Sequence, residues 1–193
     1  MSASASAEPS DESLMCAYRD GDAAAFDRLY ARHRGPVYRF FRRQLDTAEA
    51  ADELFQDVWM KLIDARNSYT PQAKFTTYLY TIAHNRLMDH FRARTRAGLR
   101  SLDADEDIAE ALAIPDHELP MSIAERRQCA EQLRTAVADL PFAQREALLL
   151  HAEGELSLEE IAVMTGTQRE TVKSRIRYAV SKLRRELSRT AAE

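Results

Sequence analysis

The chain has 193 residues, of which 45% are hydrophobic and 30% are charged, and its formal net charge is −4. This length supports one modest core or two small ones, and the composition argues against a membrane protein, a large barrel and a doubly wound sheet. The two cysteines, Cys16 and Cys129, stand far apart and form no pattern for a disulfide framework or a metal site, which indicates a reducing cytoplasm.

The beginning of the chain is small, polar and slightly acidic, which predicts a disordered leader over residues 1–13. It lacks the basic start, apolar run and cleavage site of a signal peptide. No window reaches the roughly 18 consecutive apolar residues that a membrane span requires. We therefore expect a cytoplasmic protein with no direct membrane insertion.

Charge is segregated along the chain. Residues 1–13 carry a net charge of −3, residues 14–100 of +5, residues 101–140 of −7 and residues 141–193 of +1. Such blocks indicate two modules that can approach a polyanion, separated by a strongly acidic connector.

Helical periodicity dominates the first module. Apolar and aromatic side chains recur every three or four residues from Phe26 to Phe41, which predicts a helix whose opposite face is rich in arginine. Gly35-Pro36 is expected to bend or divide this helix. A second helix is predicted over about 48–65.

The second predicted helix is acidic, with no base between Arg43 and Lys61. A polar break over residues 66–72 follows it, and the Thr70-Pro71 pair there disfavours helix. A third helix is predicted over about 75–94. No segment of this module alternates long enough to indicate a strand.

The connector over residues 101–121 contains seven acids, no base and two prolines. A capping-box pattern at Ser122–Glu125 then predicts a helix to about residue 139, and another helix is expected over about 143–152.

The last part of the chain predicts a helix-turn-helix. A capping box at Ser157–Glu160 opens a short helix that Gly166 ends. A third capping box, Thr167–Glu170, opens a longer basic helix. Two helices joined by a tight turn, the second with long polar side chains near its start, are typical of binding in a DNA major groove.

Three motifs carry a resemblance to a known family: Asp52–Trp59 (DELFQDVW), Phe75–Asn85 (FTTYLYTIAHN) and the run from Leu158 to Arg175. The chain resembles the sigma-70 family of bacterial RNA polymerase specificity factors, in the small two-domain extracytoplasmic-function (ECF) group. The resemblance covers roughly residues 14–100 and 122–188.

The resemblance implies an all-α fold of two small helical domains joined by the acidic linker of residues 101–121. Sigma region 2 would occupy residues 14–100, and sigma region 4, with the helix-turn-helix, residues 122–193. By resemblance the linker threads through the RNA exit path of the polymerase, where its acids would mimic nucleic acid. A merely solubilising spacer is the alternative.

The resemblance further implies that the acidic helix docks on the clamp helices of the largest subunit of core RNA polymerase. A carboxylate stripe beside aromatic side chains suits a basic, partly apolar partner, whereas a solvated face is the usual explanation of such a run in isolation. The residues implied for this contact are Asp52, Glu53, Phe55, Gln56, Asp57 and Trp59.

By the same resemblance, the break and the third helix open and read the −10 promoter element as single strands, which calls for base stacking and pockets. Phe75 and Tyr78 are better explained by core packing than by stacking. The family commonly has Trp where Tyr78 stands and a basic residue where Thr76 stands. The implied residues are Asn67, Ser68, Tyr69, Lys74, Asn85, Arg86, Asp89 and Arg92.

The helix-turn-helix would read the double-stranded −35 element, and ordinary solvated charges on a packed helix pair are the alternative. The residues predicted for this contact are Gln168, Arg169, Glu170, Thr171, Lys173, Ser174, Arg175 and Arg177.

The prediction is therefore a transcription initiation factor and not an enzyme. The five histidines show no metal-ligand spacing and no glycine-rich phosphate loop is present, so no metal and no cofactor are expected. Two rivals remain: a repressor or activator that uses the helix-turn-helix alone, and a sigma mimic that sequesters a regulator. The sequence leaves open whether control is by an anti-sigma factor, by phosphorylation or by expression level. It also leaves open whether the two cysteines are buried, inert thiols or oxidant sensors.

Overall fold

The structure, a computed structural model, describes residues 8–98 and 123–190, with the backbone alone for residues 123–130 and for Thr190. All regular secondary structure in this part of the chain is helical, which confirms the predicted all-α fold. The predicted linker and the predicted cap at Ser122 lie outside the described residues.

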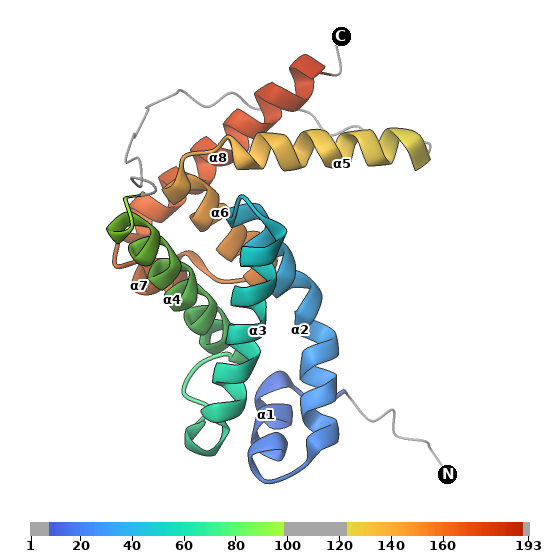
Figure 1. The fold of residues 1–193 in the computed structure, drawn as a ribbon, viewed down its shortest axis with the longest axis vertical. Coiled ribbons are helices and arrows are strands. Elements are labelled where there is room, and N and C mark those ends of the chain that lie inside the picture. The colour runs from blue at the N-terminus through green and yellow to red at the C-terminus, as the bar shows by residue number, and fades with distance from the viewer. Residues whose placement is uncertain (1–7, 99–122, 191–193) are drawn as a thin grey trace.

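The described helices form an N-terminal and a C-terminal unit (Figure 1). The N-terminal unit contains α1 (Asp11–Arg19), α2 (Ala23–Gln44), α3 (Ala48–Asp64), the 3-10 turn η1 (Arg66–Ser68) and α4 (Phe75–Arg96). The C-terminal unit contains α5 (Ile123–Ala138), α6 (Phe142–Gly154), α7 (Leu158–Thr165) and α8 (Arg169–Thr190).

Helix α1 begins inside the segment that composition assigned to a leader. The Ser10 side chain accepts a hydrogen bond from the backbone N–H of Ser13 and caps the helix, with two acids in the first turn. Leu14, Met15 and Tyr18 are buried. A local cap and three buried side chains therefore make residues 11–13 helical, where the composition of residues 1–13 had predicted disorder.

Helix α2 is not divided at Gly35-Pro36. It continues from Ala23 to Gln44 with Pro36 inside it. Proline removes one backbone hydrogen bond, but Leu29 before it and Val37 and Phe40 after it are fully buried. Tertiary packing on both sides of the proline holds one continuous helix here.

The N-terminal unit has an aromatic core. Phe40, Phe41, Phe75 and Tyr80 are completely buried, and the Tyr80 ring meets Phe40 edge-on with the two centroids 5.6 Å apart. Such edge-to-face pairs add to the free energy of burial. The core joins α2 to α4.

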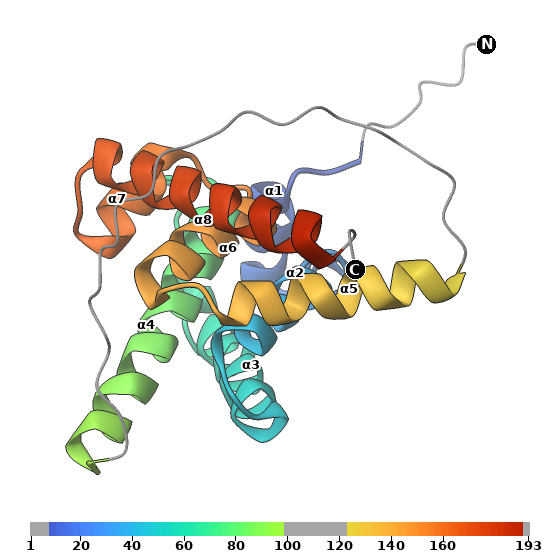
Figure 2. The same ribbon diagram turned by 90° about the horizontal axis from the view of Figure 1, so that it is seen from above.

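The C-terminal unit is built on aliphatic side chains and local helix signals. Leu149, Leu150 and Val172 are buried between α6, α7 and α8. Gly166 ends α7 in the left-handed conformation, with φ of 64°, as the sequence predicted. In two perpendicular views α5 projects sideways from the rest of the unit (Figures 1 and 2).

The two units meet where α6 packs against α2 and α4. Glu153, on α6, accepts hydrogen bonds from Arg39 Nε at 2.9 Å and from Arg43 Nη1 at 2.5 Å. His84 Nδ1 and Glu146 Oε1 lie 2.9 Å apart and are both buried. This interface therefore combines one buried polar pair, His84 and Glu146, with ion pairs of Glu153 to two arginines that remain partly exposed.

Candidate functional site

Helix α3 presents an acidic face to solvent. Thr47 caps its first turn, and Asp52, Glu53, Gln56 and Asp57 are all exposed on it. The acidic face, defined by these four residues, therefore lies where a basic partner can reach it.

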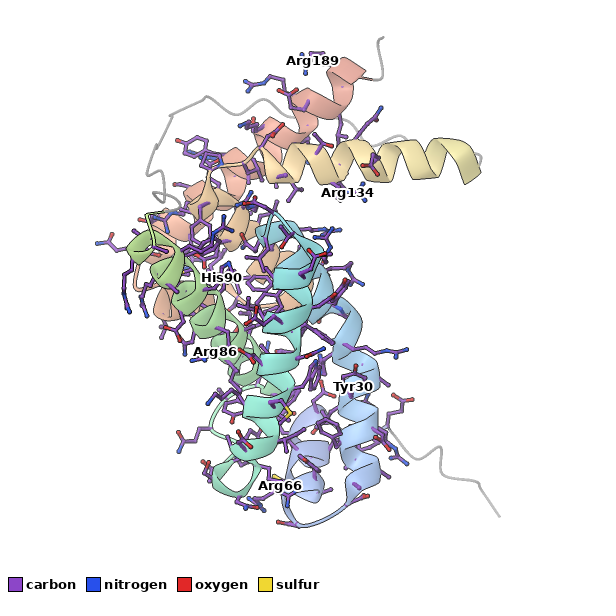
Figure 3. The ribbon with its side chains drawn as sticks, viewed as in Figure 1. Tyr30, Arg66, Arg86, His90, Arg134 and Arg189 are labelled. Carbon is purple, nitrogen blue, oxygen red and sulfur yellow. The ribbon has the colours of Figure 1, made fainter. Side chains whose placement is uncertain are left out.

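A groove of about 510 Å³ runs beside the acidic face, between α2 and α3. The half-buried rings of Tyr30, Tyr38 and Phe55 line it together with Asp52. The Tyr38 hydroxyl donates to the Asp52 carboxylate, and this hydrogen bond raises the pKa of Tyr38. Tyr30 lies on the side of α2 that faces α3 (Figure 3).

Trp59 does not lie on this surface, although the motif placed it in the docking contact. Its side chain is 5% exposed, and its ring centroid is 4.9 Å from that of Tyr30 and 6.0 Å from that of Phe26. Spacing alone placed Trp59 one turn after Phe55, but the aromatic cluster with α2 encloses the larger ring. Trp59 therefore supports the acidic face from beneath.

The loop between α3 and α4 exposes most of the side chains predicted to contact unpaired bases. Asn67, Ser68 and Lys74 are exposed, whereas Tyr69 is only 4% exposed. The Tyr69 ring packs against Tyr78 with the centroids 5.3 Å apart, and burial raises the pKa of Tyr69 to about 12. Its ring therefore supports the loop from inside, and the prediction that it lines an open pocket is corrected.

Helix α4 divides into an inner and an outer face. Phe75 is completely buried, so core packing, the explanation the spacing favoured, holds for it. On the outer face, Asp89 accepts from Arg86 at 2.7 Å and from Arg92 at 3.0 Å (Arg86 is labelled in Figure 3).

Asn85 is exposed beside this network, so all four residues predicted on α4 share one side of the helix. The two arginines are held in place by one carboxylate, and neither is buried. Such cations suit contacts with phosphates or bases.

Helix α8 exposes most of the side chains predicted to enter a major groove. Gln168, at the helix start, and Arg169, Glu170, Lys173 and Arg177 are exposed, while Thr171, Ser174 and Arg175 are half-buried. Val172 and Ala179 face the core.

The start of α8 differs from the capping box that the sequence predicted at Thr167–Glu170. The helix begins at Arg169, two residues after Thr167, and the Thr167 hydroxyl lies 3.1 Å from the hydroxyl of Thr165. Arg169 is held by hydrogen bonds to Glu159 and Glu170, which raise the pKa of its guanidinium. Two acids therefore orient this arginine on the exposed face.

Within residues 8–98 and 123–190, no group of three or more histidine, cysteine or acidic side chains is arranged to hold a metal ion. None of the described helices is long and apolar enough to cross a membrane. Cys16 is half-buried and unbridged, and the side chain of Cys129 lies outside the described residues.

Comparison with known proteins places the chain in a family. The model of Sigma-70 region 2 matches residues 29–97, and the model of Sigma-70 region 4 matches residues 130–183. The ECF RNA polymerase sigma factor RpoE of Cereibacter sphaeroides is 34% identical over 178 residues, which cover 91% of this chain and 93% of the relative. The chain belongs to the ECF group of the sigma-70 family.

Other relatives agree with this assignment. The RNA polymerase sigma-H factor of Pseudomonas aeruginosa is 30% identical, over 94% of this sigma factor and 97% of the relative. Two solved structures share the fold with a TM-score of 0.63 each. CnrH, in complex with the cytosolic domain of CnrY, is 22% identical and covers 92% of this chain and 97% of its own. RpoE of Bartonella quintana, in complex with NepR, is 24% identical, with 84% and 96% covered.

An ECF sigma factor is a transcription initiation factor that directs RNA polymerase to promoters, as the motifs predicted. Sequence reasoning missed one element of this sigma factor: α1 precedes the region 2 match and contacts both α2 and the loop after α3. Ser10 followed by Leu14, Met15 and Tyr18 at helical spacing is the signal that would have revealed it.

Proposed function

We propose that this sigma factor binds the core RNA polymerase of a bacterium through the acidic face of α3 and reads promoter DNA with both units. One observation carries the proposal. The acidic face of α3 and the basic start of α8 belong to different units, and both are exposed to solvent. A chain with one surface for a basic helix and another for a major groove can join a polymerase to a DNA site.

The C-terminal unit, residues 122–193, is the proposed reader of the double-stranded −35 element. Arg169 and Lys173 lie on the exposed side of α8 near its start, where side chains reach base edges. Arg184, Arg185 and Arg189 continue the positive charge toward the end of the helix, where they can contact phosphates.

The N-terminal unit, residues 14–100, is the proposed reader of the −10 element after strand opening. The exposed side chains between α3 and α4 lie on η1 and on the loop that leads into α4, and the outer face of α4 exposes further polar side chains. Asn67, Ser68 and Lys74 would contact extruded bases, and Arg86 and Arg92 would hold the backbone.

In this proposal the chain makes and breaks no covalent bonds, and catalysis belongs to the polymerase. The proposed place of action is the cytoplasm, without membrane insertion. The solved structures of CnrH and of Bartonella quintana RpoE contain CnrY and the anti-sigma factor NepR, respectively. An anti-sigma factor is accordingly the regulatory partner that we propose to seek by co-purification.

The docking test reverses charge on the acidic face. Asp52→Arg combined with Asp57→Arg should abolish co-purification with core polymerase while the helical circular dichroism signal is unchanged. The matched control, Asp27→Arg combined with Asp64→Arg, makes the same charge change at exposed positions outside the acidic face and should bind as the unmodified chain does. Retained binding by the first pair would contradict the docking assignment.

The promoter test uses reconstituted transcription from the DNA upstream of the gene for this chain, with permanganate footprinting of unpaired thymines. A polymerase-dependent transcript and an opened bubble are expected. Lys173→Ala should weaken binding of the upstream element about tenfold, as loss of a base contact does. DNA binding that persists without any binding to core polymerase would favour the repressor alternative.

A further inference from the structure

The start of α4 is capped by a residue from another helix. Lys74, at the N-cap position, makes no side-chain capping hydrogen bond. The backbone N–H of Phe75 instead donates to Glu12 Oε1 on α1 at 2.7 Å. The first N–H groups of a helix have no partner within the helix, and a carboxylate is favoured beside them.

The ionisation of Glu12 is consistent with this role. The hydrogen bond from the Phe75 N–H is the main cause that lowers the pKa of Glu12. Its side chain is therefore a charged acceptor at neutral pH, and such hydrogen bonds are stronger than those between neutral groups.

The same helix also holds the other end of the loop. Arg19 Nη1, in the last turn of α1, donates to the backbone carbonyl of Tyr69 at 3.2 Å. The Arg66 guanidinium lies 5.5 Å from the centre of the Tyr18 ring (Figure 3 shows Arg66 beside α1). Glu12 and Arg19 are thus two fixed points, about 10 Å apart along one helix, that hold the loop at both ends.

Helix α1 is itself anchored to α2. Asp11 accepts from Arg32 Nη1 at 2.6 Å and from His33 Nε2 at 2.7 Å, both on α2. The His33 ring lies 5.3 Å, centre to centre, from the Phe75 ring. The residues between the two fixed points, 70–74, are all exposed.

We propose that Glu12 and Arg19 are positioning residues for the recognition of unpaired bases. They set the separation of the two ends of the loop, and thereby hold residues 70–74 and the first turn of α4 in the conformation that receives single-stranded DNA. The inference rests on the proposed function of this loop and adds α1, which lies outside the family match, to the reading machinery.

The test measures three affinities of the full chain assembled with core polymerase. The probes are a single-stranded oligonucleotide with the −10 region upstream of its own gene, a duplex with the −35 region, and core polymerase itself. Glu12→Ala should weaken single-strand binding about tenfold, the effect of one lost hydrogen bond to a charged group, and leave the other two affinities unchanged.

Rescue by a conservative change separates positioning from general stability. Glu12→Gln keeps an oxygen that can accept from the Phe75 N–H and should restore most of the single-strand affinity. Arg19→Ala should weaken the same affinity, and Arg19→Lys should restore part of it. The matched control is Glu8→Ala, since Glu8 is an exposed carboxylate that pairs with Arg32 and does not touch the loop.

Two results would overturn the inference. One is unchanged single-strand binding by both alanine variants. The other is an equal loss of all three affinities, which would show that α1 only stabilises the fold. If the unmodified holoenzyme does not prefer the −10 oligonucleotide over a scrambled one, the proposed function of the loop fails, and that result is seen before any variant is made.

Discussion

Two helices of this sigma factor begin in different ways. At the start of α7, the Ser157 side chain accepts from the Glu160 N–H and the Glu160 side chain accepts from the Ser157 N–H, so the cap closes within four residues. At the start of α4, the capping carboxylate belongs to Glu12, 63 positions earlier in the chain. One start is capped locally, and the other is capped by a side chain that is in place only when α1 has packed.

The difference between the two caps agrees with the functions proposed for the helix-turn-helix and for the start of α4. Helices α7 and α8 form a compact motif with a capping box at one end and Gly166 in the turn, so both ends of α7 are stabilised by residues within the motif. The start of α4 borders a loop that must present its side chains to unpaired bases. Because its cap comes from α1, the position of α1 helps to set the conformation of that loop.

The largest predicted effect on stability concerns the first residue of α4 and the first residue of α7. Phe75→Ala should lower the free energy of unfolding by about 3–5 kcal/mol, because this ring is completely buried. Leu158→Ala should cost less than about 2 kcal/mol, because Leu158 is only half-buried. Urea unfolding followed by circular dichroism measures both, and equal losses would contradict the contrast between the two starts.

A smaller effect is expected at Glu160, which serves the local cap and also contacts the other unit. Thr77 Oγ1, on α4, donates to Glu160 Oε1 at 2.5 Å. Glu160→Ala should cost about 1–3 kcal/mol. Thr77→Val in a double-mutant cycle isolates the contact between units, for which we expect a coupling of about 1 kcal/mol. Zero coupling would show that loss of the capping box alone accounts for the stability lost in Glu160→Ala.

The Ser157 cap of α7 by itself should contribute about 1 kcal/mol to the free energy of unfolding. Ser157→Ala removes the side chain that accepts from the Glu160 N–H, and Ser157→Asp should restore most of the stability.

For α4, Lys74→Ser would install a local cap and should reduce the stability lost in Glu12→Ala. Thermal unfolding of the single and double variants measures this, and an undiminished loss would mean that the distant cap has no local substitute.

The smallest predicted effect is the pH dependence of the distant cap. Because the pKa of Glu12 is lowered from 4.5 in the folded chain, its stabilising contribution is present above about pH 4.5 and is lost as the pH falls through the folded pKa. Partial exposure limits this contribution to less than about 1 kcal/mol. The difference in unfolding free energy between the unmodified chain and Glu12→Gln should shrink on acidification, and a constant difference would contradict it.

Most of the helices were predictable from the chain because their signals are local. The periodicity of α2, the acids of α3 and the caps and glycine of α7 each act within a few residues, and the predicted bounds of α3, α4 and α6 differ from the observed ones by at most two residues. Of the two outcomes expected at Gly35-Pro36, a bend or a division, the division does not occur, because buried residues on both sides outweigh one lost hydrogen bond. Helix α1 was missed because its first three residues continue a small, polar and acidic segment, which hid the start of the helix.

Among the predicted site residues, the exposed charges were placed correctly from local signals, whereas two aromatic side chains were not. Exposed charges such as Asp52 and Lys173 lie where helical spacing placed them, since each helix has one solvent face. Trp59 and Tyr69 do not, because whether a ring is covered depends on α2 and α4, which approach from elsewhere in the chain. Aromatic spacing predicts a cluster but does not determine which ring ends up outermost.

The sequence by itself therefore determined the helical fold, the two units, the family and the exposed charged faces. Each of these depends on periodicity, caps or motifs that act over a few residues. Only the tertiary structure decided that Glu12 caps α4, that Arg19 holds the loop and that Glu153 joins the two units. These contacts link residues 50 to 110 positions apart, and their formation depends on how the helices pack.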